Sequence, residues 1–179
     1  MYCALQPLEN ANANLVNQWC AQTKANALHR DTSIRMMKAS DSETGEILAV
    51  AQWNQYVNGF ADKGLDLDGL LRICPKCVEI NKYTAIASEV AAKRKEFVTG
   101  GPTRLLTNLS TRVPYRRRGA GSALVRWGLV QAAEDGALAY LESAPNEALI
   151  GWYERHGFQR MGPFTVTVGE REEVTPMMT

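Results

Sequence analysis

Apolar residues follow two different periods along this chain. Where they recur every three or four positions, the spacing predicts helices, over Asn10–Asn26, Val78–Val98, Ala120–Ala133 and a short segment from Pro145 to Tyr153. Compact runs of apolar and β-branched residues predict strands, at Ser33–Ala39, Ile47–Trp53, Arg104–Thr111, Ala137–Glu142, Phe158–Met161 and Phe164–Val168. Helices and strands interspersed over 179 residues predict one mixed α/β domain, residues 1–179.

The connections between these segments predict how the strands pair. Residues 41–46 carry the polar and glycine chemistry of a tight turn, so the two strands beside them should form an antiparallel hairpin. The helix that ends before Asp135-Gly136 separates the next two strands, which should therefore lie parallel. We expect the last two strands to pair around Gly162-Pro163, and Pro145 to lie in the first turn or cap of the short helix.

Charge is balanced overall but uneven along the chain. Lys and Arg total 20 against 19 acidic residues, yet no Asp or Glu occurs between Gly101 and Ala133. A basic segment in a protein of balanced charge indicates one site for an anionic ligand rather than a nucleic-acid surface. The arginines of this window are Arg104, Arg112, Arg116, Arg117, Arg118 and Arg126.

The segment Arg116–Ser122 joins a predicted strand to a predicted helix and contains Gly119 and Gly121. The first N–H groups of a helix have no intrahelical acceptor, and the peptide dipoles place partial positive charge there, so main chain alone can bind a pyrophosphate. Arginine clusters are often only solvated surface. Here the coincidence of strand, Gly-x-Gly and helix start favours a phosphate ligand.

Four stretches together resemble the GNAT superfamily of acyl-CoA-dependent N-acetyltransferases. Arg116-x-x-Gly119-x-Gly121 matches the Q/R-x-x-G-x-G/A signature of that family, and Tyr153–Phe158 matches its Y-E-[KR]-x-G-F segment. The strand ending Leu109-Ser110-Thr111 and the run Tyr140–Ser143 fit between and around them. The resemblance covers about Arg104 to Val168 and extends loosely to the first hairpin.

The resemblance implies a GNAT-like mixed sheet flanked by helices, acetyl-CoA as cofactor, and an acyltransferase activity. It implies that Tyr153 is the acid that protonates the departing thiolate, because a phenol has a pKa of about 10, similar to that of a thiol. Glu142, at the end of a parallel strand, is the candidate base, acting directly or through water. The implied cofactor-binding residues are Leu109, Ser110, Thr111, Arg116, Arg117, Arg118, Gly119, Ala120, Gly121, Ser122 and Asn146.

Two other classes share parts of this pattern. A dinucleotide-dependent oxidoreductase would need a third glycine where Leu124 stands, and a P-loop hydrolase would need a Gly-Lys-Ser/Thr sequence after the turn, which is absent. A GNAT-fold protein whose chemistry is lost or altered, such as a CoA-binding regulatory module, stays open. For an active enzyme we expect a small amine or amine-bearing metabolite as acceptor, and a protein N-terminus or lysine as the second choice.

Cysteine and targeting signals are sparse. Cys74-Pro75-Lys76-Cys77 is a single C-x-x-C, and His29 and His156 have no paired spacing, so we expect reduced thiols and no metal site. The first residues lack the basic and apolar regions of a secretory signal, and no run approaches the roughly 18 apolar residues of a membrane span. We expect a cytosolic protein.

The N-terminal part is short for this family, which usually places a strand and two helices ahead of the hairpin. Only some thirty residues precede Ile34, so the first strand is either reduced to Tyr2–Leu5 or missing. An unpaired sheet edge invites a second chain to cover it, and this leads to the hypothesis of a homodimer.

Overall fold

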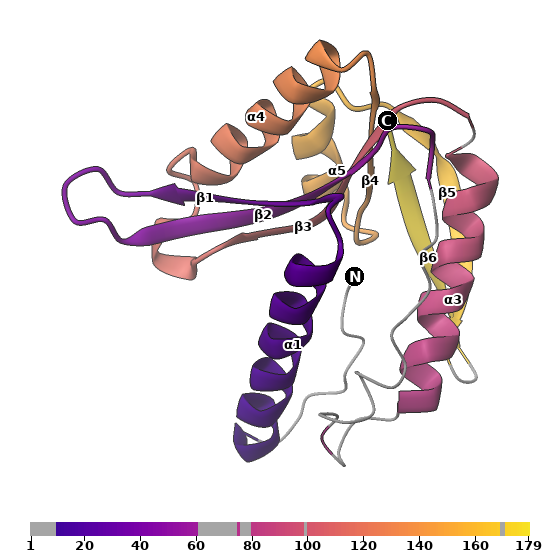
Figure 1. The fold of residues 1–179 in the computed structure, drawn as a ribbon, viewed down its shortest axis with the longest axis horizontal. Coiled ribbons are helices and arrows are strands. Elements are labelled where there is room, and N and C mark those ends of the chain that lie inside the picture. The colour runs from indigo at the N-terminus through magenta and orange to yellow at the C-terminus, as the bar shows by residue number, and fades with distance from the viewer. Residues whose placement is uncertain (1–9, 61–74, 76–79, 99, 169–170) are drawn as a thin grey trace.

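The computed structural model describes residues 10–60, 75, 80–98, 100–168 and 171–179. Within them, a six-stranded mixed sheet has the order β1-β2-β3-β4-β6-β5 (Figure 1). The helices are α1 (Asn10–Arg30), α3 (Ile80–Phe97), α4 (Ala120–Glu134) and α5 (Glu147–Glu154), with a 3-10 turn, η1, at Val113–Tyr115. The strands are β1 (Ile34–Ser40), β2 (Ile47–Tyr56), β3 (Thr103–Thr111), β4 (Leu138–Glu142), β5 (Arg160–Val168) and β6 (Arg171–Met178).

The two pairings predicted for the first four strands are confirmed: β1 and β2 form an antiparallel hairpin, and β3 pairs parallel with β4. The sequence did not predict that β2 pairs antiparallel with β3. The crossover between β3 and β4 is α4, which ends at Glu134 and is followed by Gly136 with a φ of 61°. The four predicted helices are present, and the first extends to Arg30. The suggested strand at Tyr2–Leu5 lies outside the described residues.

Two predictions for the C-terminal part are wrong. The segments Phe158–Met161 and Phe164–Val168 do not pair with each other, because β5 runs from Arg160 through Gly162-Pro163 to Val168 and pairs with β6. Gly162-Pro163 lies within the paired strand, directly after a register shift between Arg160 and Gly162, and does not form a turn. A proline without an N–H is tolerated because β5 is an edge strand. Pro145 is not the cap of α5, since Asn146 occupies that position.

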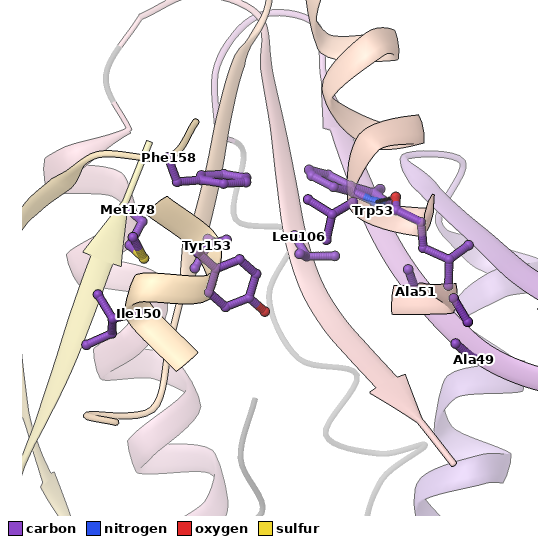
Figure 2. Close-up of a cluster of buried hydrophobic side chains, with 12 residues drawn as sticks. Ala49, Ala51, Trp53, Leu106, Ile150, Tyr153, Phe158 and Met178 are labelled. Atoms are coloured by element: carbon purple, nitrogen blue, oxygen red, sulfur yellow. Dashed lines mark hydrogen bonds between the residues drawn. The ribbon is translucent and has the colours of Figure 1, made fainter. Parts of the chain in front are cut away.

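Two apolar clusters lie on opposite faces of the sheet. On the α4 side, Trp53 and Leu106 pack with residues of α4 and α5, including Leu124, Ile150 and Tyr153 (Figure 2). On the α3 side, Leu105 and Tyr140 are packed with Val98 and Met177. Figure 1 shows α1 and α3 on the side of the sheet away from α4. Adjacent strand residues such as Leu105 and Leu106 therefore pack into clusters on opposite faces of the sheet.

The contact between Trp53 and Gly128 sets the distance between β2 and α4. Trp53 is fully buried, and its indole Nε1 donates to the carbonyl oxygen of Leu124 at 3.4 Å. A Cβ at Gly128 would lie 2.0 Å from the indole ring. The helix can approach the strand this closely only because residue 128 has no side chain. The buried face of α4 is accordingly Ala120, Leu124, Val125, Gly128 and Ala132, while Val130 is exposed.

Replacing Gly128 by Ala should lower the free energy of unfolding by about 1–3 kcal/mol, because the added methyl group overlaps a ring that has no room to move. Gly151→Ala is the matched control, since a Cβ there would meet its nearest atoms at 3.8 Å. Alanine favours a helix interior over glycine, so the control should be neutral or stabilising by up to about 1 kcal/mol. Urea denaturation measures both. Equal stability of the Gly128 variant and wild type would contradict this account of the α4 contact.

Candidate functional site

The turn between β3 and α4 has a strained backbone. Its Arg117 has a φ of 62° and is the one non-glycine residue with positive φ in the described part of the chain. Gly119 follows with a φ of 85° and is the N-cap of α4, with no side chain to satisfy the first N–H groups of the helix. A left-handed conformation costs a non-glycine residue about 1–2 kcal/mol. Such conformations occur where backbone N–H groups are arranged around an anion.

The two glycines of the turn are required for different reasons. A Cβ at Gly119 would meet no protein atom, so the positive φ alone favours glycine there. A Cβ at Gly121 would lie 3.2 Å from Oγ1 of Thr111, so this glycine permits the close approach of α4 to the end of β3. The first turn of α4 therefore lies directly beside the last residue of the strand.

The basic segment divides into paired and unpaired arginines. Arg104 is buried and lies at the other end of β3, where its Nη2 is 2.6 Å from Oδ2 of Asp135. Arg112 donates to Glu46 of the hairpin. Within the described residues, no ion pair involves the exposed arginines of the turn or α4, which are Arg116, Arg117, Arg118 and Arg126. Positive charge is thus concentrated at the N-terminus of α4.

β3 and β4 are paired over only part of their length. The parallel pairing runs from Thr103↔Leu138 to Leu106↔Leu141, and β4 ends one residue later. β3 continues to Thr111 beside β2 alone among the described strands. The N–H of Arg112 bonds to Leu48 of β2, so by alternation the main-chain groups of Leu109 and Thr111 face the β4 side, where they have no strand partner. The carbonyl oxygen of Thr111 accepts from Nε of Arg116 at 3.3 Å, and the other groups are available to an extended ligand.

Thr107 is the extra residue of a bulge in β3, opposite Gln52 and Trp53. Its hydroxyl donates to the carbonyl oxygen of Gln52 at 3.2 Å and lies 3.1 Å from Oδ1 of Asn54. A bulge bends a strand and increases its local twist. It occurs here at the point where β3 parts from β4.

Tyr153 lies on α5 within the cluster on the α4 side. Its ring packs edge-on against Phe158 with centroids 5.8 Å apart, and against Trp152 at 4.9 Å. Figure 2 shows the phenol oxygen on the side of the ring away from Phe158. The side chain is 7% exposed, so its orientation is determined by packing. Leu109 of β3 packs against the same cluster.

Asn146 has a local structural partner. Its Oδ1 accepts a hydrogen bond from the N–H of Leu149 at 3.0 Å, which makes it the N-cap of α5. It therefore fixes the start of the helix that carries Tyr153. The side chain remains exposed to solvent, at the same end of α5 as the carboxyl end of β4.

Glu142 forms a buried ion pair with Arg94 of α3. Arg94 Nε donates to Oε1 at 2.5 Å and Nη2 donates to Oε2 at 2.7 Å, with the two side chains 11% and 12% exposed. Tyr140 donates to Oε1 at 3.2 Å. Burial acts to lower the pKa of Arg94, but the hydrogen bonds and charge of Glu142 outweigh it and raise that pKa. Burial, followed by the charge of Glu142, raises the pKa of Tyr140, which stays a neutral donor.

Comparison with known sequences decides the family. The sequence model of the Acetyltransferase (GNAT) family matches residues 16–158, which is most of the chain. The chain belongs to this family. Its members transfer acetyl groups from acetyl-CoA, so this GNAT protein is an acetyl-CoA-dependent acetyltransferase. No curated protein matches the sequence.

Solved structures share the fold of this GNAT protein at low sequence identity. A structure of histone acetyltransferase HPA2 and related acetyltransferase from Corynebacterium glutamicum has a TM-score of 0.63 and 20% identity, covering 98% of this chain and 80% of that one. Arabidopsis thaliana NAA60 with acetyl-CoA has a TM-score of 0.55 and 14% identity, covering 97% and 94%. The same protein with a bisubstrate analogue has a TM-score of 0.55 and 12% identity, covering 97% and 95%. At these identities the likeness concerns the fold alone.

The residues present suit acetyl-CoA. The N-terminus of α4, with its positive-φ turn and unpaired arginines, has the donors and charge that phosphates require. The unpaired side of β3 supplies main-chain groups for an extended arm. The sequence had indicated both features from Arg116–Ser122 and Leu109–Thr111.

The sequence carries no signal for several of the contacts. Arg94 is one of several charged residues on α3, and nothing in its spacing relates it to Glu142, which follows 48 positions later. Tyr115 lies directly before the motif that starts at Arg116, and the pattern does not indicate that its hydroxyl donates to Glu46. Arg104 and Arg112 were counted with the anion site, although both have carboxylate partners.

Other predictions touch parts that the structure describes incompletely. Cys74 and Cys77 lie outside the described residues. Within the residues that are described, no three His, Cys, Asp or Glu side chains gather as metal ligands would. None of the described helices combines the length and apolar character needed to cross a lipid bilayer.

Removing either partner of the Arg94–Glu142 pair should destabilise the fold, because the other charge is left buried without a partner. Arg94→Met and Glu142→Gln should each lower the free energy of unfolding by about 3 kcal/mol, and the double variant should lose less than the sum. Lys93→Met is the control, since Lys93 forms an exposed pair with Glu96 on the same helix and should cost less than about 1 kcal/mol. Urea denaturation of the set measures the coupling, and strictly additive losses would contradict the pairing.

Proposed function

We propose that this GNAT protein is a cytosolic N-acetyltransferase that transfers the acetyl group of acetyl-CoA directly to a small amine or amine-bearing metabolite. The observation that carries the proposal is the turn Arg116–Ser122. Its strained backbone, the open helix start at Gly119 and three arginines lie beside the unpaired side of β3. In this proposal the turn holds the pyrophosphate, and Leu109, Ser110 and Thr111 hold the pantetheine arm.

Bound acetyl-CoA supplies the acetyl group as a thioester, which an uncharged amine can attack. The chain must then supply a proton to the departing thiolate and accept one from the amine nitrogen. Tyr153 is the proposed proton donor. Its ring is held by Phe158 and Trp152, and packing leaves its phenol oxygen on the side away from Phe158. A phenol with a pKa of about 10 is protonated at neutral pH and matches a thiolate in basicity.

Glu142 is the proposed proton acceptor. Its Oε1 accepts from both Arg94 and Tyr140, which occupies both lone pairs of that oxygen. Its Oε2 accepts from Arg94 alone, so one lone pair remains for the amine or for a bridging water. Arg94 thereby orients the carboxylate, and Oε2 is the oxygen that would accept the proton.

The two proposed groups belong to opposite layers of the sheet. Tyr153 packs in the cluster on the α4 side, whereas Glu142 is bonded to Arg94 on the α3 side. A thioester lying where β3 parts from β4 would have one group on each side. This separation suits the reaction, because the group that accepts the proton of the amine nitrogen and the group that protonates the departing sulfur act on different atoms.

The charges described on the α3 side favour an acceptor without a strong charge of its own. Arg94 is neutralised by Glu142, and Lys93 by Glu96. The polar groups of β2 and β3 on this side are uncharged amides and hydroxyls, such as Gln52, Asn54 and Thr107. They support a neutral, hydrogen-bonding amine better than a highly basic or acidic peptide.

Acetylation assays with a panel of acceptors test this proposal. Purified protein with acetyl-CoA should release CoA thiol, detected with a disulfide reagent, in the presence of small amines such as amino sugars. Short peptides with a free N-terminus or lysine are the comparison set. Turnover of peptides alone would overturn the choice of acceptor. Binding of CoA without transfer to either set would instead favour a GNAT-fold CoA-binding module.

Tyr153→Phe should reduce kcat by about 10²- to 10⁴-fold, the usual contribution of a general acid, and leave the Kd for CoA unchanged. Glu142→Gln should reduce kcat over the same range, because the carboxylate that would accept the amine proton is removed. Arg94→Met is the comparison, because it breaks the same ion pair but keeps the carboxylate, so it should lose less kcat than Glu142→Gln although the carboxylate is no longer oriented. Equal kinetic losses in the Glu142 and Arg94 variants would reject Glu142 as the base, and equal loss of binding and turnover would reject Tyr153 as the acid.

A further inference from the structure

The tip of the β1–β2 hairpin is bonded to the start of the basic turn. Glu46, the residue before β2, accepts a hydrogen bond from the hydroxyl of Tyr115 through Oε2 and from the guanidinium of Arg112 through Oε1. Arg112 also donates to the carbonyl oxygen of Ile47 at 3.2 Å. Hydrogen bonds from Tyr115 and then Arg112 lower the pKa of Glu46, so it is charged at neutral pH. One carboxylate thus joins the hairpin to both ends of η1.

The ring of Tyr115 lies against two guanidinium groups. The Cζ atom of Arg112 is 5.2 Å from the ring centroid, and that of Arg118 is 5.6 Å away. Both distances are within the range of a cation–π contact. Arg112 is held by Glu46, whereas Arg118 has no ion pair among the described residues. Tyr115 therefore contacts Arg118 inside the turn as well as Arg112, which precedes it.

The hairpin provides a rigid base for these contacts. Oδ1 of Asp41 accepts from the N–H groups of Glu43 and Thr44 at 3.0 and 2.9 Å, and from the Thr44 hydroxyl at 3.1 Å. The N–H of Asp41 donates to the carbonyl oxygen of Glu46 at 2.9 Å, which closes the turn. Glu46 is therefore fixed by its own loop before it binds Tyr115.

We propose that Tyr115 and Glu46 are positioning residues for the cofactor, which hold the turn Arg116–Ser122 in the conformation that receives the phosphates. Arg117 adopts its left-handed conformation two residues after Tyr115, and Arg118 lies over the Tyr115 ring. A turn that is already ordered loses less conformational freedom when an anion binds. This inference rests on the proposed binding of the pyrophosphate by the turn.

The test measures the Kd for CoA by titration calorimetry, together with unfolding in the absence of CoA. Tyr115→Phe keeps the ring and its guanidinium contacts but removes the hydroxyl. It should raise the Kd for CoA about three- to tenfold, the effect of one lost hydrogen bond, with little change in the melting temperature. Glu46→Gln should raise the Kd at least as much. Glu43→Gln removes the same charge from the same exposed turn without touching the basic segment, and should match wild type.

Kinetics with two acetyl donors distinguish a positioning role from a general effect on folding, because only one of the donors carries phosphates. For Tyr115→Phe, kcat/KM should fall about three- to tenfold with acetyl-CoA and stay unchanged with S-acetylpantetheine, which lacks the phosphates. Equal losses with both donors, or a drop in melting temperature without CoA that accompanies the loss of binding, would overturn the positioning role.

Gly119→Asp separates this inference from the proposed function. Aspartate there adds a negative charge and a strained φ at the helix start, so CoA binding should be lost. If Gly119→Asp abolishes binding while Tyr115→Phe and Glu46→Gln bind like wild type, the positioning role is wrong and the phosphate site stands. If Gly119→Asp binds CoA like wild type, the phosphate site is wrong, and the positioning role is overturned with it.

Discussion

The packing of Trp53 against Gly128 is the contact on which the geometry of the site depends. It allows α4 to approach β2 closely, and the helix then begins beside the end of β3, where Gly121 lies against Thr111. The turn between strand and helix is confined by these two contacts. Within it, Arg117 and Gly119 adopt left-handed conformations, with φ of 62° and 85°. A strained turn is maintained only when the elements on both sides are fixed.

The second constraint is the length of β4. It pairs with β3 over four residues and then turns toward α5, while β3 continues beside β2. This difference exposes the main chain of β3 on one side. Successive residues of β4 lie in different layers, as in any strand: Leu141 packs toward α4 and α5, while Tyr140 and Glu142 face α3. The unpaired side of β3 therefore results from one short strand, and the two layers beside it result from the alternation of side chains.

Some charged residues form ion pairs that join elements of the fold, whereas the arginines of the turn Arg116–Ser122 lie outside those pairs. Arg104 with Asp135 ties β3 to the end of α4, and Arg94 with Glu142 ties α3 to β4. Arg104, Arg94 and Glu142 are largely buried, where an unpartnered charge would be unfavourable, whereas Asp135 lies at the surface. The arginines of the turn are exposed and lie outside these pairs. An even overall charge therefore coexists with a local excess of positive charge at the helix start.

The sequence by itself determined the helices, the hairpin, the parallel crossover and the turn at Arg116–Ser122 between strand and helix, because these depend on local periodicity, turn residues and the spacing of two glycines. It did not reveal β6, whose charged and proline-containing segment has no strand-like alternation, nor that β5 passes straight through Gly162-Pro163. Only the tertiary structure decided that Arg94 holds Glu142, that Glu46 holds Tyr115, and that Gly128 makes room for Trp53. These contacts join residues far apart in the chain, and their distances are set by how whole elements pack.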